Sequence, residues 1–187
     1  MPHSIEPADA CQWLPQSLLS PMPGPLTLDW LFDTGSMTQR LTQLSNNGFS
    51  ITPLFEGWQP LRDDECVALG LPLATVGWVR ETYLHGNGQP WVFARCVAAR
   101  STLQGDGLHM DALGSRPLGS LLFSDHAFNR QAIEVCRYPR QWLPADHQIE
   151  GLWARRSRFD RGPLSVLVAE VFLPGLWQAV HNPAENC

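Results

Sequence analysis

Two hairpin-like segments constrain the fold of this chain more than any other feature of its sequence. In the first, the strand-like residues 75–84 and 91–99 flank a turn that contains glycine and asparagine. In the second, residues 152–159 and 164–173 flank a shorter turn that also contains glycine. Glycine and asparagine readily adopt the positive φ that such turns require. Strands joined by short turns run antiparallel, so the sequence predicts an antiparallel sheet.

Helical patterns come mostly before the hairpins, and strand and helix alternate little. A capping box, Ser36-Met37-Thr38-Gln39, marks the start of one helix, and Asn46-Asn47-Gly48 marks its end. We also expect helices at 26–32 and 117–123, a short helix or turn at 62–69, and strand character at 49–55 and 130–138. This arrangement favours an α+β fold with an antiparallel sheet. No glycine-rich dinucleotide motif follows a strand.

The two ends of the chain differ in character from its middle. Residues 1–25 contain six prolines and predict a poorly regular lead-in with at most one short helical turn near 13–19. The residues after Leu176 are expected to form an untethered tail. We therefore divide the chain into a proline-rich lead-in at 1–25, one folded domain at 26–176 and a tail at 177–187.

Composition and charge limit the partners and the compartment. Hydrophobic residues make up 44% of the 187 residues and the mean hydropathy is -0.15, as in ordinary globular proteins. The formal net charge of -5 disfavours nucleic acid and anionic membranes as partners. No apolar run approaches the roughly 20 residues that span a bilayer, and the N-terminus lacks an export signal. We expect a cytoplasmic monomer that binds no nucleic acid and does not insert stably into membranes.

The reactive side chains form no local metal-binding or disulfide motif. The five cysteines are widely spaced without a C-x-x-C pair, and the six histidines are scattered. This usage indicates a reducing compartment and predicts no metal site. The chain contains no lysine, which excludes Schiff-base chemistry and a P-loop lysine. All 13 basic residues are arginines, which can bind carboxylates in a bidentate manner.

Glu170 lies on the apolar face of a predicted strand. Because strand side chains alternate between faces, it shares its face with Leu164, Val166, Val168 and Phe172. A buried carboxylate is costly unless it is paired or used, and these neighbours offer no charge compensation. Burial in general raises the pKa of a carboxyl group, which suits a general acid near neutral pH. The alternatives are an exposed strand end or an ion pair with a structural arginine.

Arg80 is the second charged residue on an apolar strand face. It alternates with Trp78, Thr82 and Leu84. An inward guanidinium there could hold a ligand carboxylate through two parallel hydrogen bonds. The alternative is a structural ion pair with a carboxylate such as Glu170 or Glu81. Arg95, which shares a strand face with Trp91, Phe93 and Val97, is a weaker candidate of the same kind.

Residues 153–158, Trp-Ala-Arg-Arg-Ser-Arg, form the most basic run in the chain. Such a run is typical of a solvated strand edge on which arginine packs against tryptophan. The acidic total charge argues against a role in nucleic-acid binding. No G-x-S-x-G or comparable sequence supports a hydrolase nucleophile.

An ordered series of short motifs resembles one known family. The motifs are Asp29-Trp30-Leu31, Gly35-Ser36-Met37-Thr38, Trp78-Val79-Arg80-Glu81, Gly88-Gln89-Pro90-Trp91, Pro117-Leu118-Gly119, Leu122-Phe123, Trp153-Ala154-Arg155-Arg156-Ser157-Arg158 and Glu170-Val171-Phe172-Leu173-Pro174. No single motif is diagnostic, but their order and spacing over residues 26–174 are specific. In this series the chain resembles the chorismate lyases, also called chorismate–pyruvate lyases.

The resemblance implies a function as well as a fold. This family converts chorismate to 4-hydroxybenzoate and pyruvate, the first committed step of ubiquinone biosynthesis in many Gram-negative bacteria. It uses no metal and no organic cofactor. Its fold is a single antiparallel sheet with helices packed against it, and the ligand is buried under flap-like segments. By resemblance, we expect residues 26–176 to carry this activity, with chorismate as substrate and 4-hydroxybenzoate as a product that leaves slowly.

The resemblance also implies four ligand contacts, which are Met37, Arg80, Leu118 and Glu170. Arg80 would hold the ring carboxylate, and Met37 and Leu118 would contact the apolar faces of the ring. Glu170 would handle protons, either by protonating the leaving group or by relaying the C4 proton, so Glu170 and Arg80 are the expected catalytic pair. Without the resemblance, Met37 and Leu118 would be interpreted as ordinary core residues.

The chain departs from the family pattern at one position close to the expected site. The family usually has a Gly-Arg pair where this chain has Ala94-Arg95, and the added methyl could loosen the product or narrow the pocket.

The competing interpretation is a non-catalytic effector-binding module, because ligand-sensing domains of some transcription regulators resemble the lyase fold. Such sensors carry a helix-turn-helix ahead of the sensor domain. Residues 1–25 are expected to be too short and too proline-rich to form one.

Overall fold

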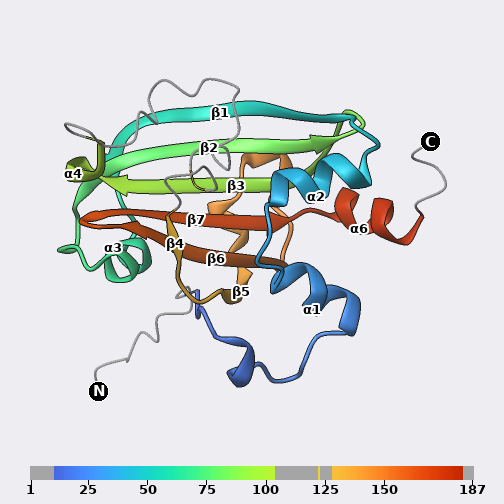
Figure 1. The fold of residues 1–187 in the computed structure, drawn as a ribbon, viewed down its shortest axis with the longest axis horizontal. Helices are drawn as coiled ribbons and strands as arrows, with labels where there is room; N and C mark the ends of the chain where they lie inside the picture. The colour runs from blue at the N-terminus through green and yellow to red at the C-terminus, as the bar shows by residue number, and fades with distance from the viewer. Residues whose placement is uncertain (1–10, 104–121, 123–127, 183–187) are drawn as a thin grey trace, which may run out of the picture.

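The computed structural model describes residues 11–103, 122 and 128–182, which form one antiparallel sheet with helices packed on it (Figure 1). Within this part of the chain the sheet has seven strands, in the order β1-β2-β3-β7-β6-β4, and β5 pairs with β6. The strands are β1 (Phe49–Pro60), β2 (Val76–Gly86), β3 (Gln89–Ala99), β4 (Asn129–Arg130), β5 (Glu134–Tyr138), β6 (Leu152–Arg161) and β7 (Leu164–Phe172). The predicted fold class is therefore confirmed.

The two predicted hairpins form the centre of the sheet. Strands β2 and β3 are joined at Asn87 and Gly88, with φ values of 51° and 77° that suit a tight hairpin turn. Strands β6 and β7 are joined around Gly162, whose φ is 56°. The hairpins meet where β3 pairs with β7, and this register places Ala94 directly opposite Glu170.

The helices cover the two faces of the sheet unequally. They are α1 (Pro25–Leu31), α2 (Met37–Leu44), α3 (Asp63–Leu69), α4 (Arg100–Leu103) and α6 (Pro174–His181), and the short 3-10 turns are η1 (Gln16–Leu18), η3 (Arg140–Trp142) and η4 (Ala145–His147). Helices α1, α2 and α6 share one hydrophobic cluster with Leu84, Val92 and Phe172 of the sheet. Helix α3 packs on the other face, where Cys66 contacts a cluster that contains Val79 and Val97.

Helix α2 begins as the sequence predicts. Ser36 is its N-cap, and the Ser36 hydroxyl accepts a hydrogen bond from the backbone N–H of Gln39 at 3.3 Å. Met37 and Leu41 are buried on the helix face that meets the sheet. This capping contact fixes the point at which the chain turns from the loop after α1 onto the sheet.

The expectation of an untethered segment after Leu176 is wrong for residues 177–181. These residues complete α6, in which Leu176 and Ala179 are buried. The ring of Trp177 packs edge to face on Phe172, with centroids 5.7 Å apart. Pro174 stands in the first turn of the helix, where a missing N–H costs little. The proline thus begins a helix whose second half the sequence interpretation placed in the tail.

The ends of several other elements differ from their predicted positions. The turn expected near 13–19 is present as η1, and β1 extends beyond the predicted 49–55 to Pro60. The strand expected at 130–138 is divided into β4 and β5. Apart from Leu122, the helix expected at 117–123 lies outside the described residues. No helix within the described part of the chain has the length and apolar character needed to cross a membrane.

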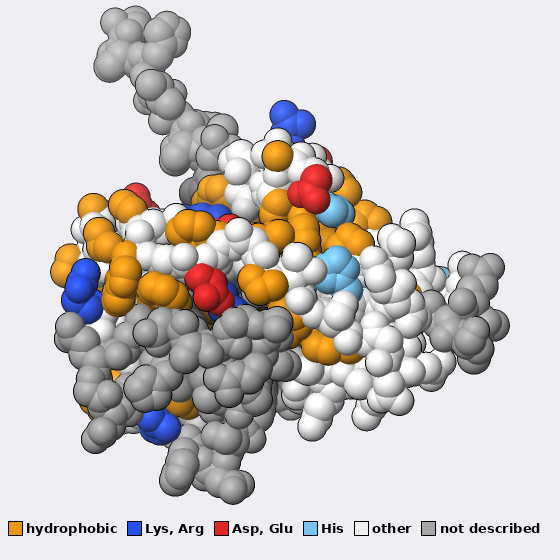
Figure 2. All heavy atoms as spheres, turned by 90° about the horizontal axis from the view of Figure 1, so that it is seen from above, with side chains coloured by type: hydrophobic (Ala, Val, Ile, Leu, Met, Phe, Trp, Pro, Cys, Tyr) orange, Lys and Arg blue, Asp and Glu red, His pale blue; other side chains and the backbone are white. Residues whose placement is uncertain are grey.

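Strand β1 forms one edge of the described sheet and carries hydrophobic side chains that solvent reaches. Figure 2 shows hydrophobic side chains gathered on the face of the molecule seen from above in Figure 1. Leu54, Phe55 and Trp58 of β1 are between 38% and 42% exposed. Trp58 packs on Trp78 with ring centroids 5.4 Å apart, and the guanidinium of Arg100 lies 4.5 Å from its ring. These contacts cover part of the apolar edge.

Candidate active site

A cavity of about 630 Å³, including its mouth, opens on the sheet face that carries α2. Side chains from six strands of the sheet (β1, β2, β3, β4, β6 and β7) form its floor, and the start of α2 forms one wall. The described lining residues are Gly35, Ser36, Met37, Thr38, Ile51, Arg80, Thr82, Leu84, Ala94, Cys96, Leu122, Arg130, Arg155, Phe159, Val168 and Glu170. Most of the wall is apolar with a few convergent charged groups, which is typical of a small-molecule site.

Three of the four sequence-predicted ligand contacts line this cavity. Met37 lies at the start of α2, Arg80 lies on β2 and Glu170 lies on β7. Strand alternation directs Arg80 and Glu170 to the same face of the sheet, as predicted. Leu118, the fourth contact, lies outside the described residues. The structure thus brings Met37, Arg80 and Glu170 together, and their contact with substrate stays a prediction.

The carboxylate of Glu170 is paired with Arg155. The Nε of Arg155 donates to Oε2 of Glu170 at 2.6 Å, and Nη1 donates to the carbonyl oxygens of Trp30 and Asp33 at 3.2 and 2.7 Å. Arg155 is 1% exposed, among the most buried side chains described. The alternative of an ion pair with an arginine is therefore confirmed, and the partner is Arg155. Because arginine stays protonated at physiological pH, Arg155 places a buried cation directly beside this carboxylate.

Arg80 and Glu170 do not form the structural pair considered as an alternative. Instead Nε of Arg80 lies 3.3 Å from Oε1 of Glu56, its neighbour across the β1–β2 pair. The Arg80 side chain is 3% exposed and that of Glu56 is 23% exposed. Glu81, the other partner considered, contacts Arg95 on the opposite face of the sheet. Two separate arginine–carboxylate pairs therefore border the cavity.

Arg130 is a cavity residue that sequence analysis missed. Its Nε donates to the hydroxyl of Ser157 at 2.9 Å, and its Nη1 donates to the carbonyl oxygen of Thr34 at 3.2 Å. Burial, followed by repulsion from Arg155, lowers the pKa of the Arg130 guanidinium from its ordinary value. Arginine pKa values remain far above neutral, so this side chain is a cation in the site. Among the described lining residues, three guanidinium groups face a single carboxylate.

Asp33 supports the loop that borders the cavity before Met37. Its Oδ1 accepts the backbone N–H of Gly35 at 2.8 Å, and its Oδ2 accepts a hydrogen bond from Arg40 at 2.9 Å. Burial alone would raise the pKa of the Asp33 carboxyl group. The bonds from Gly35 and Arg40 and the charges of Arg40 and Arg155 outweigh burial, so the pKa lies below its usual value. The loop and Arg155 are thus linked through one ionised residue.

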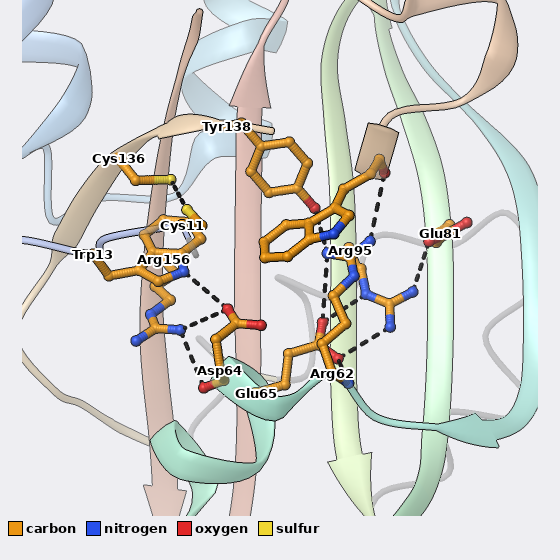
Figure 3. A network of polar contacts seen from close by, with 11 residues as sticks. Cys11, Trp13, Arg62, Asp64, Glu65, Glu81, Arg95, Cys136, Tyr138 and Arg156 are labelled. Atoms are coloured by element: carbon orange, nitrogen blue, oxygen red, sulfur yellow. Dashed lines mark hydrogen bonds and ion pairs between the residues drawn. The ribbon is translucent and has the colours of Figure 1, made fainter. Parts of the chain in front are cut away.

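Arg95, the weaker arginine candidate, does not reach the cavity. It lies on the other face of the sheet and donates to Glu65 at 2.6 and 3.0 Å and to Glu81 at 2.7 Å (Figure 3). Burial alone would lower the pKa of Arg95, but its bonds to Glu65 and Glu81 raise it overall. Alternation accounts for this placement, because Arg95 stands next to Ala94, which faces the cavity. The prediction of a ligand contact at Arg95 is wrong.

The basic run at 153–158 is not a solvated edge. Arg155 and Arg156 are 1% and 8% exposed, and only Arg158 has a side chain that is 40% exposed. Arg156 binds Glu134 at 2.9 Å and Asp64 at 3.1 Å. Strand β6 lies inside the sheet, between β7 and the pair β4 and β5, so its side chains are covered. The predicted packing on tryptophan is present, with Arg156 over the ring of Trp13 at 4.6 Å.

Comparison with known proteins decides the family. The sequence matches the family described as Chorismate lyase over residues 8–182. This chain belongs to the chorismate lyase family. A relative from Pseudomonas fluorescens (strain Pf0-1) described as a probable chorismate pyruvate-lyase 2 is 67% identical, covering 98% of this chain and 100% of that protein. A probable chorismate pyruvate-lyase from Pseudomonas fluorescens (strain Pf-5) is 65% identical over the full length of both chains. The protein is accordingly a carbon–oxygen lyase.

The fold of this chorismate lyase also resembles solved structures of low sequence identity. PhnF from Mycobacterium smegmatis superposes with a TM-score of 0.52 at 13% identity, covering 76% of this chain and 65% of that chain. The effector domain of PhnF superposes with a TM-score of 0.50 at 12% identity, covering 76% and 91%. At this identity the likeness shows the fold alone. Within the described residues, no group of three or more His, Cys, Asp or Glu side chains could hold a metal ion.

Proposed function

We propose that this lyase eliminates pyruvate from chorismate and releases 4-hydroxybenzoate. The observation that carries the proposal is the charge arrangement of the cavity, in which Arg80, Arg130 and Arg155 converge with Glu170. Chorismate carries one carboxylate on its ring and a second on its enolpyruvyl group. Three guanidinium groups belong to the described lining of the cavity, and two of them, Arg80 beside Glu56 and Arg155 beside Glu170, also contact a carboxylate. Their donors can bind the two carboxylates of such a ligand.

The positions of the arginines suggest how the substrate lies. Arg80 lies on β2 and Arg130 on β4, and strands β3, β7 and β6 separate them in the sheet. We assign the ring carboxylate to Arg80 and the enolpyruvyl carboxylate to Arg130. The ring would then lie over the middle strands, where Ala94 and Glu170 face each other in register. Met37 would pack on the ring from the α2 side, as the family resemblance implies.

Glu170 would then carry out the proton transfer. Arg155 contacts Oε2 of Glu170, so we assign Oε1 to the substrate. In our scheme the carboxylate accepts the C4 proton while the C3–O ether bond breaks and its electron pair leaves with the oxygen. The ring becomes aromatic as 4-hydroxybenzoate, and the departing enolpyruvate gains a proton and becomes pyruvate. Positioning and proton transfer account for catalysis, because aromatisation supplies the driving force.

Arg155 would act as a positioning residue in this scheme. Its two hydrogen bonds to the carbonyl oxygens of Trp30 and Asp33 hold the guanidinium in place. The guanidinium in turn fixes the rotamer of Glu170 and leaves its Oε1 for the substrate.

We further propose that the product enters ubiquinone biosynthesis and that the enzyme works as a cytoplasmic monomer. Family membership supports the pathway. The four cysteines within the described residues are all free thiols, which fits a reducing compartment.

Incubation of the purified full-length protein with chorismate tests the reaction. We expect 4-hydroxybenzoate and pyruvate in equal amounts, separated by chromatography and identified by mass. The matched control is Glu150→Gln, because Glu150 has a side chain that is 78% exposed and lies on no wall of the cavity. This variant should match the parent. A different hydroxybenzoate isomer, or pyruvate without an aromatic product, would contradict the proposal.

A further inference from the structure

Two cysteines meet on the sheet face opposite the active-site cavity. The sulfur atoms of Cys11 and Cys136 lie 2.7 Å apart, although 125 positions separate the residues in the sequence (Figure 3). Cys136 lies on β5 and belongs to a cluster with Tyr83 and Phe93, whereas the cavity faces α2. The proposed lyase reaction uses neither thiol, so this pair needs an explanation of its own.

Several contacts hold Cys11 in this position. Leu14 forms an isolated antiparallel bridge with Val135, through N–H···O bonds of 2.9 and 2.8 Å in the two directions. The indole N–H of Trp13 donates to Oδ2 of Asp64 at 2.9 Å. Arg156 binds the same Asp64 oxygen at 3.1 Å and covers the Trp13 ring. The segment around Cys11 is thus attached to β5, α3 and β6 at once.

The two thiols differ in environment. Cys136 is 4% exposed and lies opposite Ala154 across the β5–β6 pair. Cys11 is only partly buried. Both line a surface hollow together with Leu14, Tyr138 and Gln141, so a small oxidant can reach the pair from solvent. One accessible thiol beside one buried thiol is the arrangement of an attacking and a resolving cysteine.

We propose that Cys11 and Cys136 form a reversible disulfide that fastens the N-terminal segment to β5 when the protein meets a peroxide. In the first step the Cys11 sulfur attacks hydrogen peroxide, forming a sulfenic acid and releasing water. In the second step the Cys136 sulfur attacks the sulfenic sulfur, the S–O bond breaks, and the hydroxide takes the Cys136 proton as a second water. Two thiols are oxidised, and one peroxide is reduced to two waters.

The order of these steps follows from the environments. Burial raises the pKa of the Cys136 thiol, and its contact with Cys11 raises it further. A buried thiol of this kind is a poor first nucleophile, because the thiolate is the reactive form. It can still attack a sulfenic acid that forms in direct contact with it. We therefore assign the first step to Cys11.

The Cys11–Cys136 disulfide would raise the stability of the folded protein and leave the lyase reaction unchanged. A cross-link between residues so far apart in sequence restricts the unfolded chain strongly. The native segment is already attached at Trp13 and Leu14, so the folded state needs little rearrangement. Because the pair lies on the opposite face from Glu170, the cavity keeps its shape. We expect the oxidised protein to melt roughly 5–15 °C higher than the reduced protein.

Peptide mapping tests the pairing directly. The chain has no lysine, so trypsin cleaves only after arginine, and each cysteine falls in a different peptide. Cys11 lies in residues 1–40 and Cys136 in residues 131–137. The full-length protein is reduced, treated with hydrogen peroxide, alkylated and digested without reductant. We expect one cross-linked species that joins these two peptides and disappears on reduction with dithiothreitol.

Variants separate this pair from the other cysteines. Cys11→Ser and Cys136→Ser should each lose the cross-link and the rise in melting temperature. Cys66→Ala, which alters a fully buried cysteine on α3, should keep both. The parent protein alone decides the matter if a variant folds poorly. Peroxide-treated parent in which Cys136 remains fully alkylatable, or in which Cys11 is joined to Cys187 or to another chain, would overturn the proposal.

Discussion

Nε of Arg155 donates to Oε2 of Glu170 over 2.6 Å, from the residue directly opposite it in the β6–β7 pair. The same guanidinium binds the carbonyl oxygens of Trp30 and Asp33, which lie at the end of α1 and just after it. The orientation of the carboxylate in the cavity therefore depends on the helix layer as well as on the sheet. A change in the loop between α1 and α2 can alter the orientation of Glu170 through the Arg155 side chain alone.

Replacing Arg155 by methionine should separate positioning from chemistry. Methionine has a similar length but leaves the largely covered Glu170 carboxylate, whose side chain is 12% exposed, unpaired. This should cost about 3 kcal/mol of unfolding free energy, the lower end of the range for a broken buried pair. Without the hydrogen bond from Arg155 the carboxylate loses its fixed position beside the substrate, so kcat should fall while KM changes little. Denaturant unfolding and steady-state kinetics measure the two effects.

The matched control for this variant lies on the same strand. Arg158→Met removes an ion pair to Asp160 from a side chain that is 40% exposed, and it should cost about 1 kcal/mol or less. Its kcat and KM should coincide with those of the parent. If Arg155→Met also left kcat unchanged, Arg155 would have only a structural role.

Much of this arrangement can be predicted from sequence, but the burial of Arg155 inside the sheet was not predicted. A hairpin that turns at Gly162 and Pro163 pairs Arg161 with Leu164, and counting back along both strands places Arg155 opposite Glu170. The register of the β6–β7 pair could therefore be derived from the sequence once the turn was recognised. The run at 153–158 was assigned to a solvated edge instead, because local composition does not show that β4 and β5 cover β6 from its other side.

The remaining errors also come from long-range pairing. Arg130 enters the cavity because β4 pairs with β6 across almost 30 positions of sequence, from Arg130 to Phe159, and no local motif marks this pairing. Arg95 was assigned to a site from its apolar neighbours, although its partner Glu65 lies on a helix that packs on the opposite face. Hydrophobic alternation predicted which residues share a face correctly for β2 and β7, since alternation is a property of each strand alone.

Substituting glutamine for Glu170 should identify the proton acceptor. Glutamine keeps the shape of the side chain but cannot accept a proton at neutral pH. Turnover should therefore fall by about 10²–10⁴, the usual contribution of general acid–base catalysis. Affinity for 4-hydroxybenzoate should fall much less, because Arg80 and Met37 remain. Turnover, product affinity and melting temperature are measured on one preparation, and a folded variant with near-parent turnover would exclude the catalytic role.

Replacement of Arg80 by lysine should weaken product binding. Lysine is a compact donor and cannot reproduce the planar, bidentate contact of a guanidinium with a carboxylate. We expect the affinity for 4-hydroxybenzoate to fall by about 1–3 kcal/mol, the range for a hydrogen bond to a charged group. Calorimetry measures the change, with Arg140→Lys as the control, since the Arg140 side chain is 64% exposed. Unchanged affinity in the Arg80 variant would remove this residue from the site.

Ala94→Gly should slow the release of product. Ala94 is 6% exposed, lines the cavity and lies opposite Glu170 across the β3–β7 pair. Removing its methyl group relieves crowding beside the ring, and one methyl group corresponds to about a threefold to fivefold change in the dissociation constant. Ala98→Gly introduces the same backbone change on β3, outside the cavity. Equal product affinity in the Ala94 variant and the parent would show that the methyl group does not contact the ligand.

The pair between Glu65 and Arg95 predicts how stability depends on pH. Glu65 is 4% exposed, and burial alone would raise the pKa of its carboxyl group. The hydrogen bonds and charge of Arg95, together with Arg62, outweigh burial and hold this pKa below its ordinary value of 4.5. The folded-state pKa is thus below the unfolded one. Stabilisation by Glu65 is then fully present above about pH 4.5 and is lost as the pH falls through the folded-state value.

The variant Glu65→Gln tests whether the stabilisation by Glu65 is lost as the pH falls. The variant loses a buried ion pair and should be about 3–5 kcal/mol less stable than the parent at neutral pH. Glutamine does not titrate, so the difference between variant and parent should narrow as the pH is lowered to about 3. Glu150→Gln, on an exposed side chain, should follow the parent throughout. Denaturant unfolding at several pH values measures the difference, and a gap that stays constant over this range would show that Glu65 keeps the same pKa in the folded and unfolded chains.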